Sequence, residues 1–239
     1  MSTFTWLRGR GPALSQAQLE RRAALAEPAP LGPLPLAQQR LVVLDLETSG
    51  LDMKRDQVLS IGAVAIANGA IDFSQQFERT LCRHDHKVSA SVLIHGIAPS
   101  EIANGVEPAE ALLDFMEFLG DSPVLAFHAP FDQRMLGRAL KQSLGYRLRH
   151  VFFDAADLAP LLCPQANIPH GGLDDWTRYF GLQVQQRHHA SADALVTAEL
   201  ALILFSKARQ QQLDSLQALQ QRLASWHRRQ RAHSLHRQH

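Results

Sequence analysis

The chain has 239 residues, of which 46% are hydrophobic and 20% charged, and this ordinary balance excludes wholesale disorder. Its 14 glycines and 12 prolines follow no period, and its 2 cysteines are too few for a disulfide framework or a cysteine-based zinc site. No apolar run approaches the roughly 20 residues of a membrane span, and the N-terminus lacks the apolar core of a secretory signal. We therefore expect a cytoplasmic protein with no membrane contact.

The net charge of +1 conceals an asymmetry between the two parts of the chain. Residues 207–239 hold seven Lys or Arg and one Asp, a net charge of +6, so residues 1–206 carry −5. Acidic side chains collect metal ions, and a basic segment attracts phosphates. The pattern favours an acidic body with a basic end.

The first 40 residues differ in composition from the rest of the chain. Residues 13–27 have the composition of a short helix, and PAPLGPLP at 28–35 has four prolines in eight residues, as in a stiff linker. We expect residues 1–40 to form a helical arm and a proline-rich linker, with packing on the surface of the body as the open alternative.

The regular body begins at residue 41 and alternates strands with helices. Expected strands lie at 41–47, 58–67, 70–81, 123–128 and 149–153, and expected helices at 108–119, 131–144, 173–180 and 191–209. The first three strands have short links and should be antiparallel, whereas the later strands follow helices and should run parallel to the first. This order predicts an α/β three-layer fold, with a five-stranded mixed sheet and helices on both faces.

The C-terminal part, 207–239, is expected to be a basic helix and tail. A stripe at helical spacing consists of Leu213, Leu216, Leu219, Leu223 and Trp226. It fits a helix that packs on the body or on a second copy, or one that docks a polymerase or another protein. The basic segment from Trp226 onward is expected to be disordered.

Acidic residues stand at the ends of predicted elements. Asp45 and Glu47 are two residues apart in the first strand, so both side chains point to one face near the end where open α/β sheets place ligands. Asp132 begins the helix after the fourth strand, and Asp193 begins the last helix of the body, with His188 in the loop before it. Each of these is common as a cap or structural residue, but together they predict one site.

Oxygen ligands of this kind suit Mg²⁺ or Mn²⁺. Two such ions about 3.5–4 Å apart can clamp a phosphodiester, with one activating water and the other stabilising the leaving oxygen. A neutral histidine nearby can take the proton of that water.

Three segments resemble the motifs of the DEDDh 3′–5′ exonucleases: DLETSGLD at 45–52, FHAPFD at 127–132 and HHASAD at 188–193. The similarity is greatest to the proofreading epsilon subunit of bacterial DNA polymerase III and its stand-alone relatives, and it covers about 41–206. The resemblance implies a ribonuclease H-like fold.

The resemblance also implies roles for individual residues. Asp45, Glu47, Asp132 and Asp193 would bind two divalent cations, Mg²⁺ or Mn²⁺, and His188 would be the general base, whereas His189 is out of register. Thr48, His95 and Phe131 would line the pocket of the 3′-terminal nucleotide. The second motif usually begins His-Asn, but Phe127 and His128 stand there, a departure that bears on substrate positioning rather than on metal binding.

The implied function is 3′–5′ hydrolysis of single-stranded DNA from its 3′ end to nucleoside 5′-monophosphates, in proofreading or repair. One alternative is an exoribonuclease similar to ribonuclease T or oligoribonuclease, since 2′-hydroxyl contacts depend on loop geometry. Another alternative is an inactive exonuclease-like binding module, although every expected ligand is present.

Overall fold

The computed structural model describes residues 13–83, 96–183 and 188–236. A five-stranded sheet in the order β3-β2-β1-β4-β5 forms its centre. The strands are β1 (Leu41–Thr48), β2 (Val58–Ala67), β3 (Ala70–Thr80), β4 (Val124–Ala126) and β5 (Phe152–Asp154). β1, β2 and β3 pair antiparallel, while β4 runs parallel to β1 and β5 to β4. The predicted mixed sheet is confirmed.

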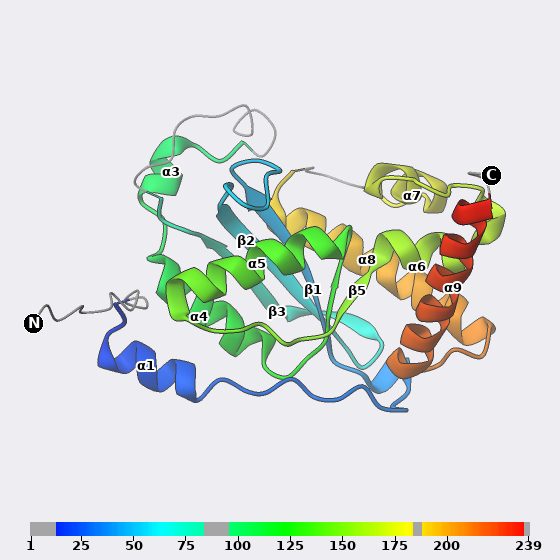
Figure 1. Ribbon diagram of the computed structural model, residues 1–239, viewed down its shortest axis with the longest axis horizontal. Helices are drawn as coiled ribbons and strands as arrows, with labels where there is room; N and C mark the ends of the chain where they lie inside the picture. The colour runs from blue at the N-terminus through cyan, green and yellow to red at the C-terminus, as the bar shows by residue number, and fades with distance from the viewer. Residues whose placement is uncertain (1–12, 84–95, 184–187, 237–239) are drawn as a thin grey trace, which may run out of the picture.

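Helices cover both faces of this sheet (Figure 1). The helices of the body are α3 (Pro99–Ala103), α4 (Pro108–Leu119), α5 (Ala129–Leu144), α6 (Ala155–Leu162), α7 (Leu173–Phe180) and α8 (Ala190–Gln210). Alternate residues of β1 enter different cores: Val42 and Leu44 pack with α4 and α5, whereas Leu41 and Val43 pack with α6 and α8. The three-layer architecture follows from this alternation.

Several elements of the body differ from the sequence-based expectation: α3 was not anticipated, and β4 is shorter than the expected 123–128. β5 is Phe152–Asp154 rather than 149–153, because its pairing with β4 begins at Phe152 opposite Val124. Helix α6 begins directly after β5 and was not anticipated, because Pro160 lies inside its short sequence and is typical of a helix breaker.

The N-terminal segment packs on the body through apolar contacts of Leu14 and Leu25 and through an ion-pair cluster. Helix α1 (Gln16–Ala23) is shorter than the expected 13–27 and is capped by Ser15, whose hydroxyl accepts from the Gln18 backbone. Arg21 forms ion pairs at 2.6–2.8 Å with three acids of α4, which are Glu110, Asp114 and Glu117. The arm therefore lies along α4 (Figure 1).

The C-terminal segment is a helix up to His236, so the disorder expected from Trp226 onward is wrong for the described residues. Helix α9 runs over Leu216–His236, and Leu216, Leu219 and Leu223 are buried in the core shared with α6 and α8. Trp226 packs against the same core, and the next residue, His227, contacts Asp157 of α6 at 2.9 Å. The apolar stripe therefore packs on the body of its own chain, and the basic residues Arg228, Arg229 and Arg231 continue the same helix.

Within the three described ranges, no helix is both long enough and apolar enough to cross a membrane.

The packing of α9 predicts a measurable contribution to stability. Leu219 is fully buried, so Leu219→Ala should lower the free energy of unfolding by about 2–5 kcal/mol in urea titrations. The neighbouring Gln220 is exposed, and Gln220→Ala serves as the matched control with a change near zero. A loss at Leu219 no larger than at Gln220 would show that α9 does not belong to the core.

Candidate active site

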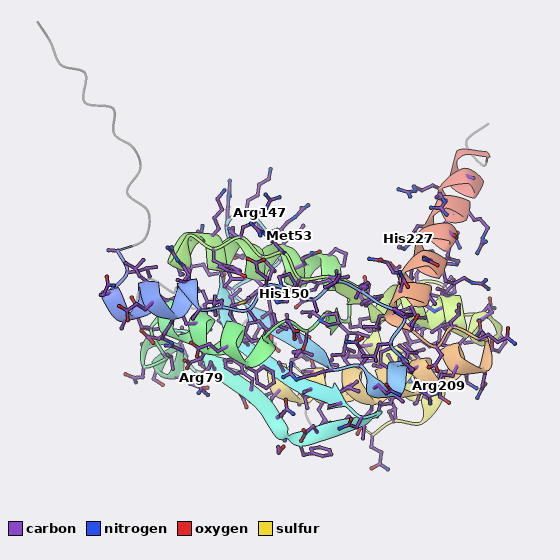
Figure 2. All side chains as sticks on the ribbon, turned by 90° about the horizontal axis from the view of Figure 1, so that it is seen from below. Met53, Arg79, Arg147, His150, Arg209 and His227 are labelled. Atoms are coloured by element: carbon purple, nitrogen blue, oxygen red, sulfur yellow. The ribbon has the colours of Figure 1, made fainter. Side chains whose placement is uncertain are left out.

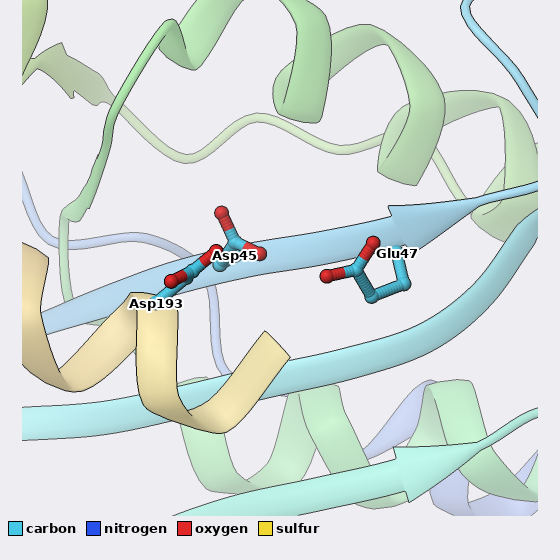
Figure 3. Close-up of side chains that lie close together, drawn as sticks. All are labelled: Asp45, Glu47 and Asp193. Atoms are coloured by element: carbon cyan, nitrogen blue, oxygen red, sulfur yellow. The ribbon is translucent and has the colours of Figure 1, made fainter. Parts of the chain in front are cut away.

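The two carboxylates of β1 share one face of the strand near its carboxyl end. Asp45 is half-buried and Glu47 is 9% exposed, opposite Gly62 and Ser60 of β2 in the register of the sheet. The strand period of two residues directs both side chains to the same side, as predicted from the sequence. That side is the one on which α8 begins (Figure 3).

The third carboxylate of the cluster comes from α8. Asp193 lies in the first turn of that helix and is 5% exposed. One carboxylate oxygen each from Asp45, Glu47 and Asp193 lie within 4.8 Å of one another, and Figure 3 shows the three side chains converging from β1 and α8. Residues separated by almost 150 positions in the sequence therefore meet in one acidic cluster, as the sequence predicted.

Gly62 allows α8 to approach the sheet this closely. A Cβ atom at Gly62 would overlap the backbone carbonyl carbon of Ala190 and the backbone nitrogen of Ser191. Gly62 is also the register partner of Asp45. Only a residue without a side chain lets the first turn of α8 rest on β2 beside Asp45, and so brings Asp193 into the cluster. From the sequence alone, this glycine was identified only as part of a strand.

Asp132 stands next to this cluster but is not one of its three members. It lies in the first turn of α5 and is 4% exposed, and the backbone of Leu46, between Asp45 and Glu47, acts to lower its pKa. Burial, followed by the charges of Asp154 and Glu47, raises the pKa of Asp132 well above its usual value. All four predicted acids therefore lie around the end of β1, with negative charge concentrated in a poorly solvated place.

This donor set fits a hard divalent cation. The cluster offers only carboxylate oxygens, which suit Mg²⁺ or Mn²⁺ better than zinc. Several carboxylates at this spacing repel one another, and burial removes the water that would screen them. A bound cation is the ligand that relieves both costs.

The two adjacent histidines before α8 have different surroundings. His188 is exposed, has a left-handed backbone with φ of 63°, and its backbone N–H donates to Asp193 Oδ2 at 3.0 Å. His189 has ring contacts at both nitrogens: Nε2 lies 3.2 Å from Glu78 Oε1 and Nδ1 lies 3.1 Å from Ser191 Oγ. His188 is thus tethered to a member of the acidic cluster, whereas the ring of His189 is engaged with β3.

Of the three residues expected to contact a terminal nucleotide, the structure describes Thr48 and Phe131. Thr48 is 8% exposed, and its hydroxyl donates to the Gly50 carbonyl at 2.8 Å. Phe131 lines an open pocket of about 370 Å³. The other residues around this pocket are Met53, His128, Pro130, Arg134 and Asp154. His95 lies outside the described residues, so its expected position in the pocket stays a prediction.

The departure in the second motif keeps the turn that begins α5. His128 has a left-handed backbone with φ of 62°, a conformation that Asn, Asp and His adopt more readily than most residues. Phe127 is buried in the core shared with α8, and its ring meets that of His128 edge-on at 4.8 Å between centroids. A histidine in the usual asparagine position therefore fits the left-handed turn that leads into α5 and Asp132.

Asp154 is a structural acid of the site that was not predicted from the sequence. One of its carboxylate oxygens accepts from the backbone N–H groups of His128 and Ala156, each at 2.9 Å. It therefore caps α6 and fastens the first residues of α5 to the end of β5, although burial raises its own pKa. The capping role of Asp154 could have been predicted from the sequence, because an aspartate directly before an alanine-rich helix is a common N-cap.

The close approach at Gly62 can be tested by metal binding. Gly62→Ala should force the first turn of α8 away from β2 and weaken Mn²⁺ binding at least about tenfold, because Asp193 leaves the cluster. Isothermal titration with Mn²⁺ measures this. A Cβ at Gly32 would meet no atom within 4 Å, so Gly32→Ala is the control and should leave the affinity unchanged. Equal affinities in both variants would contradict the role of Gly62.

The sequence of this chain is similar to those of known exonucleases and DNA polymerases. A family model described as exonuclease (RNase_T) matches residues 42–201. The PolC-type DNA polymerase III of Thermotoga maritima is 35% identical over 162 residues, which are 67% of this chain and 11% of that polymerase. The Bacillus subtilis polymerase of the same type is 26% identical over 174 residues, 72% of this chain and 12% of that polymerase. The chain thus spans a small part of these relatives.

Solved structures agree in fold. Escherichia coli exonuclease I, in a complex with single-stranded DNA, matches with a TM-score of 0.61 and 20% identity, over 74% of this chain and 42% of that one. Exonuclease I from Methylocaldum szegediense matches with a TM-score of 0.60 and 22% identity, over 73% and 42% of the two chains. The sheet order, the acidic cluster and the family match over the body together show that this chain belongs to the RNase_T family of exonucleases.

Proposed function

We propose that the protein is a metal-dependent 3′–5′ exonuclease that removes nucleoside 5′-monophosphates from the 3′ end of single-stranded DNA. The observation that carries this proposal is the meeting of Asp45, Glu47 and Asp193 oxygens within 4.8 Å of one another in a chain of an exonuclease family. DNA is favoured because the curated relatives are DNA polymerases and the similar E. coli exonuclease I binds a dT13 oligonucleotide.

The proposed cofactor is a pair of divalent cations, Mg²⁺ or Mn²⁺. Asp45, Glu47, Asp132 and Asp193 would hold them. When bound, such ions activate water and stabilise the charge on the leaving oxygen of the phosphodiester. The four acids contribute the negative charge that retains the cations. Gly62 keeps Asp193 in position by letting α8 approach the sheet, and Asp154 keeps Asp132 in position by fastening the start of α5.

His188 is the proposed general base. Its backbone hydrogen bond to Asp193 tethers it beside the proposed metal ligands, and its exposure leaves the ring open to solvent water. A neutral imidazole takes the proton of the attacking water, whose oxygen bonds to phosphorus as the bond from phosphorus to the 3′-oxygen of the shortened strand breaks. That 3′-oxygen takes a proton from solvent water and becomes a hydroxyl. Thr48, His95 and Phe131 would line the pocket of the terminal nucleotide.

The proposed exonuclease unit is 41–206, with 1–40 as an N-terminal arm and 207–239 as a C-terminal helix and tail. We place the protein in the cytoplasm, acting in DNA proofreading or repair. A polymerase or another protein partner at α9 would meet its exposed polar residues, such as Arg228 and Arg229, because the leucines of α9 are buried in the chain's own core.

Substrate and metal dependence can be measured together. Matched labelled single-stranded DNA, duplex DNA, mismatched duplex and RNA are digested with Mn²⁺. We expect fastest shortening of single-stranded DNA from its 3′ end, and loss of nearly all activity in EDTA or in Asp45→Ala, because both remove the cations. Asp121→Ala, which removes an exposed carboxylate away from the cluster, is the control.

Other results of this experiment have defined meanings. Faster digestion of RNA would replace the DNA preference with the exoribonuclease alternative. No digestion of any substrate, with binding retained, would favour the inactive binding module. Activity that persists in EDTA would contradict a metal-dependent mechanism.

The two histidines before α8 provide a matched pair for the general base. His188→Ala should lower the rate by about 10²–10⁴, the usual contribution of a positioned base, and should leave Mn²⁺ binding intact. His189→Ala should cost much less, because its ring contacts Glu78 and Ser191. Single-turnover rates at saturating DNA measure the difference. A larger loss at His189 would overturn the assignment.

A further inference from the structure

Two arginines share a small polar pocket beside the start of β2. The pocket has a volume of about 140 Å³ and lies between the end of the loop at residues 49–57 and one side of α5. Arg83 and Arg138 line it together with the polar side chains Gln57, Gln142 and Ser143. None of these residues belongs to the acidic cluster or to the pocket lined by Phe131.

The guanidinium of Arg83 is held in a fixed orientation. Its Nε and Nη2 both donate to the Val58 carbonyl, at 3.1 and 3.0 Å. Arg138 approaches from α5, where it is half-buried. Burial lowers the pKa of Arg83, and the nearby charge of Arg138 lowers it further. Two like charges are therefore kept close together in a partly desolvated place, an arrangement that costs free energy.

No carboxylate of the described residues forms an ion pair with either arginine. The charge of Glu107 raises the pKa of Arg83, but its effect is smaller than the opposite effect of Arg138. The Glu107 carboxylate already caps α4, accepting from the Glu110 backbone at 3.0 Å and from Gln18 at 3.4 Å. Residues 1–206 carry a net charge of −5, so this concentration of positive charge contrasts with its surroundings. An anion is the ligand that offsets it.

The arginine pocket lies next to the candidate active site, because β2 and α5 contribute residues to both regions. Val58 is the register partner of Thr48, and the backbone of Ser49 donates to the Gln57 carbonyl at 2.9 Å. Along α5, Arg134 lies one turn before Arg138 and lines the pocket of Phe131, where its side chain contacts Met53 at 3.8 Å. Figure 2 shows Met53 on the side of the molecule that α5 occupies. Along α5, the arginine that lines the arginine pocket, Arg138, is thus one helical turn after the arginine that lines the Phe131 pocket, Arg134.

We propose that Arg83 and Arg138 form a phosphate-binding site. A tetrahedral phosphate presents several oxygens, which two guanidinium groups and the neighbouring amide and hydroxyl groups can share. The phosphate comes either from a nucleic-acid strand or from a free anion such as inorganic phosphate. Its binding from a strand rests on the proposed exonuclease function, whereas its binding as a free anion does not.

The test compares Arg138→Gln with a variant that loses the same charge elsewhere. Arg209, at the end of α8 and exposed, is labelled in Figure 2 well away from Met53, so Arg209→Gln is the control. Binding of inorganic phosphate and of a labelled single-stranded DNA oligonucleotide is titrated over a salt series. Neither titration requires turnover, so an inactive enzyme would contradict the proposed function without affecting this test.

We expect Arg138→Gln to weaken binding about tenfold, as loss of a hydrogen-bonded charge does. Its unfolding temperature should be unchanged or higher, because the repulsion between Arg138 and Arg83 is removed. For the oligonucleotide, the slope of log affinity against log salt should fall by about 0.7, the contribution of one phosphate. Arg138→Lys, which keeps the charge but not the planar fork, should restore the slope and only part of the affinity.

The two ligands distinguish the source of the phosphate. Weakening for the oligonucleotide assigns the site to the strand, and weakening for inorganic phosphate alone assigns it to a free anion. The proposal is overturned if neither ligand is affected, or if Arg209→Gln lowers the affinity and the slope as much as Arg138→Gln does, since the effect would then be one of net charge.

Discussion

The first turn of α8 rests directly on β2, and the arrangement of the site depends on this contact. At Gly62 the backbone of Ala190 and Ser191 occupies the space that any side chain would fill. Gly62 is the register partner of Asp45, so the contact sets the start of α8 next to Asp45. Asp193, in the first turn of α8, therefore lies close to Asp45. The burial of α8 against β1 and β2 supplies the apolar packing that holds this approach.

Buried negative charge is the second constraint on this part of the fold. Asp132 and Asp154 both have raised pKa values because both are buried, yet both accept backbone N–H groups that favour their ionised forms. Asp154 fastens the start of α5, and the backbone of Leu46 in β1 favours the ionised carboxylate of Asp132. Hydrogen bonds thus set the positions of the acids, while a bound cation would balance their charge.

Much of this arrangement could be predicted from local sequence patterns. The alternation in β1 placed Asp45 and Glu47 on one face, and the short links at Asn68-Gly69 indicated the antiparallel strands. Gly62 could not be interpreted in the same way, because its role comes from a helix that begins almost 130 residues later. Likewise, α9 had too basic a sequence to be expected as an ordered helix throughout, since its buried leucines gain stability only from tertiary contacts with α6 and α8.

The central claim is that β1 and α8 together form a divalent cation site. Crystals of the full chain soaked in Mn²⁺ and measured for anomalous scattering test it most directly. We predict an anomalous peak bounded by the carboxylates of Asp45, Glu47 and Asp193, with oxygen ligands at about 2.0–2.6 Å. Well-diffracting crystals with no peak at these carboxylates, or with Mn²⁺ bound only elsewhere, would contradict it.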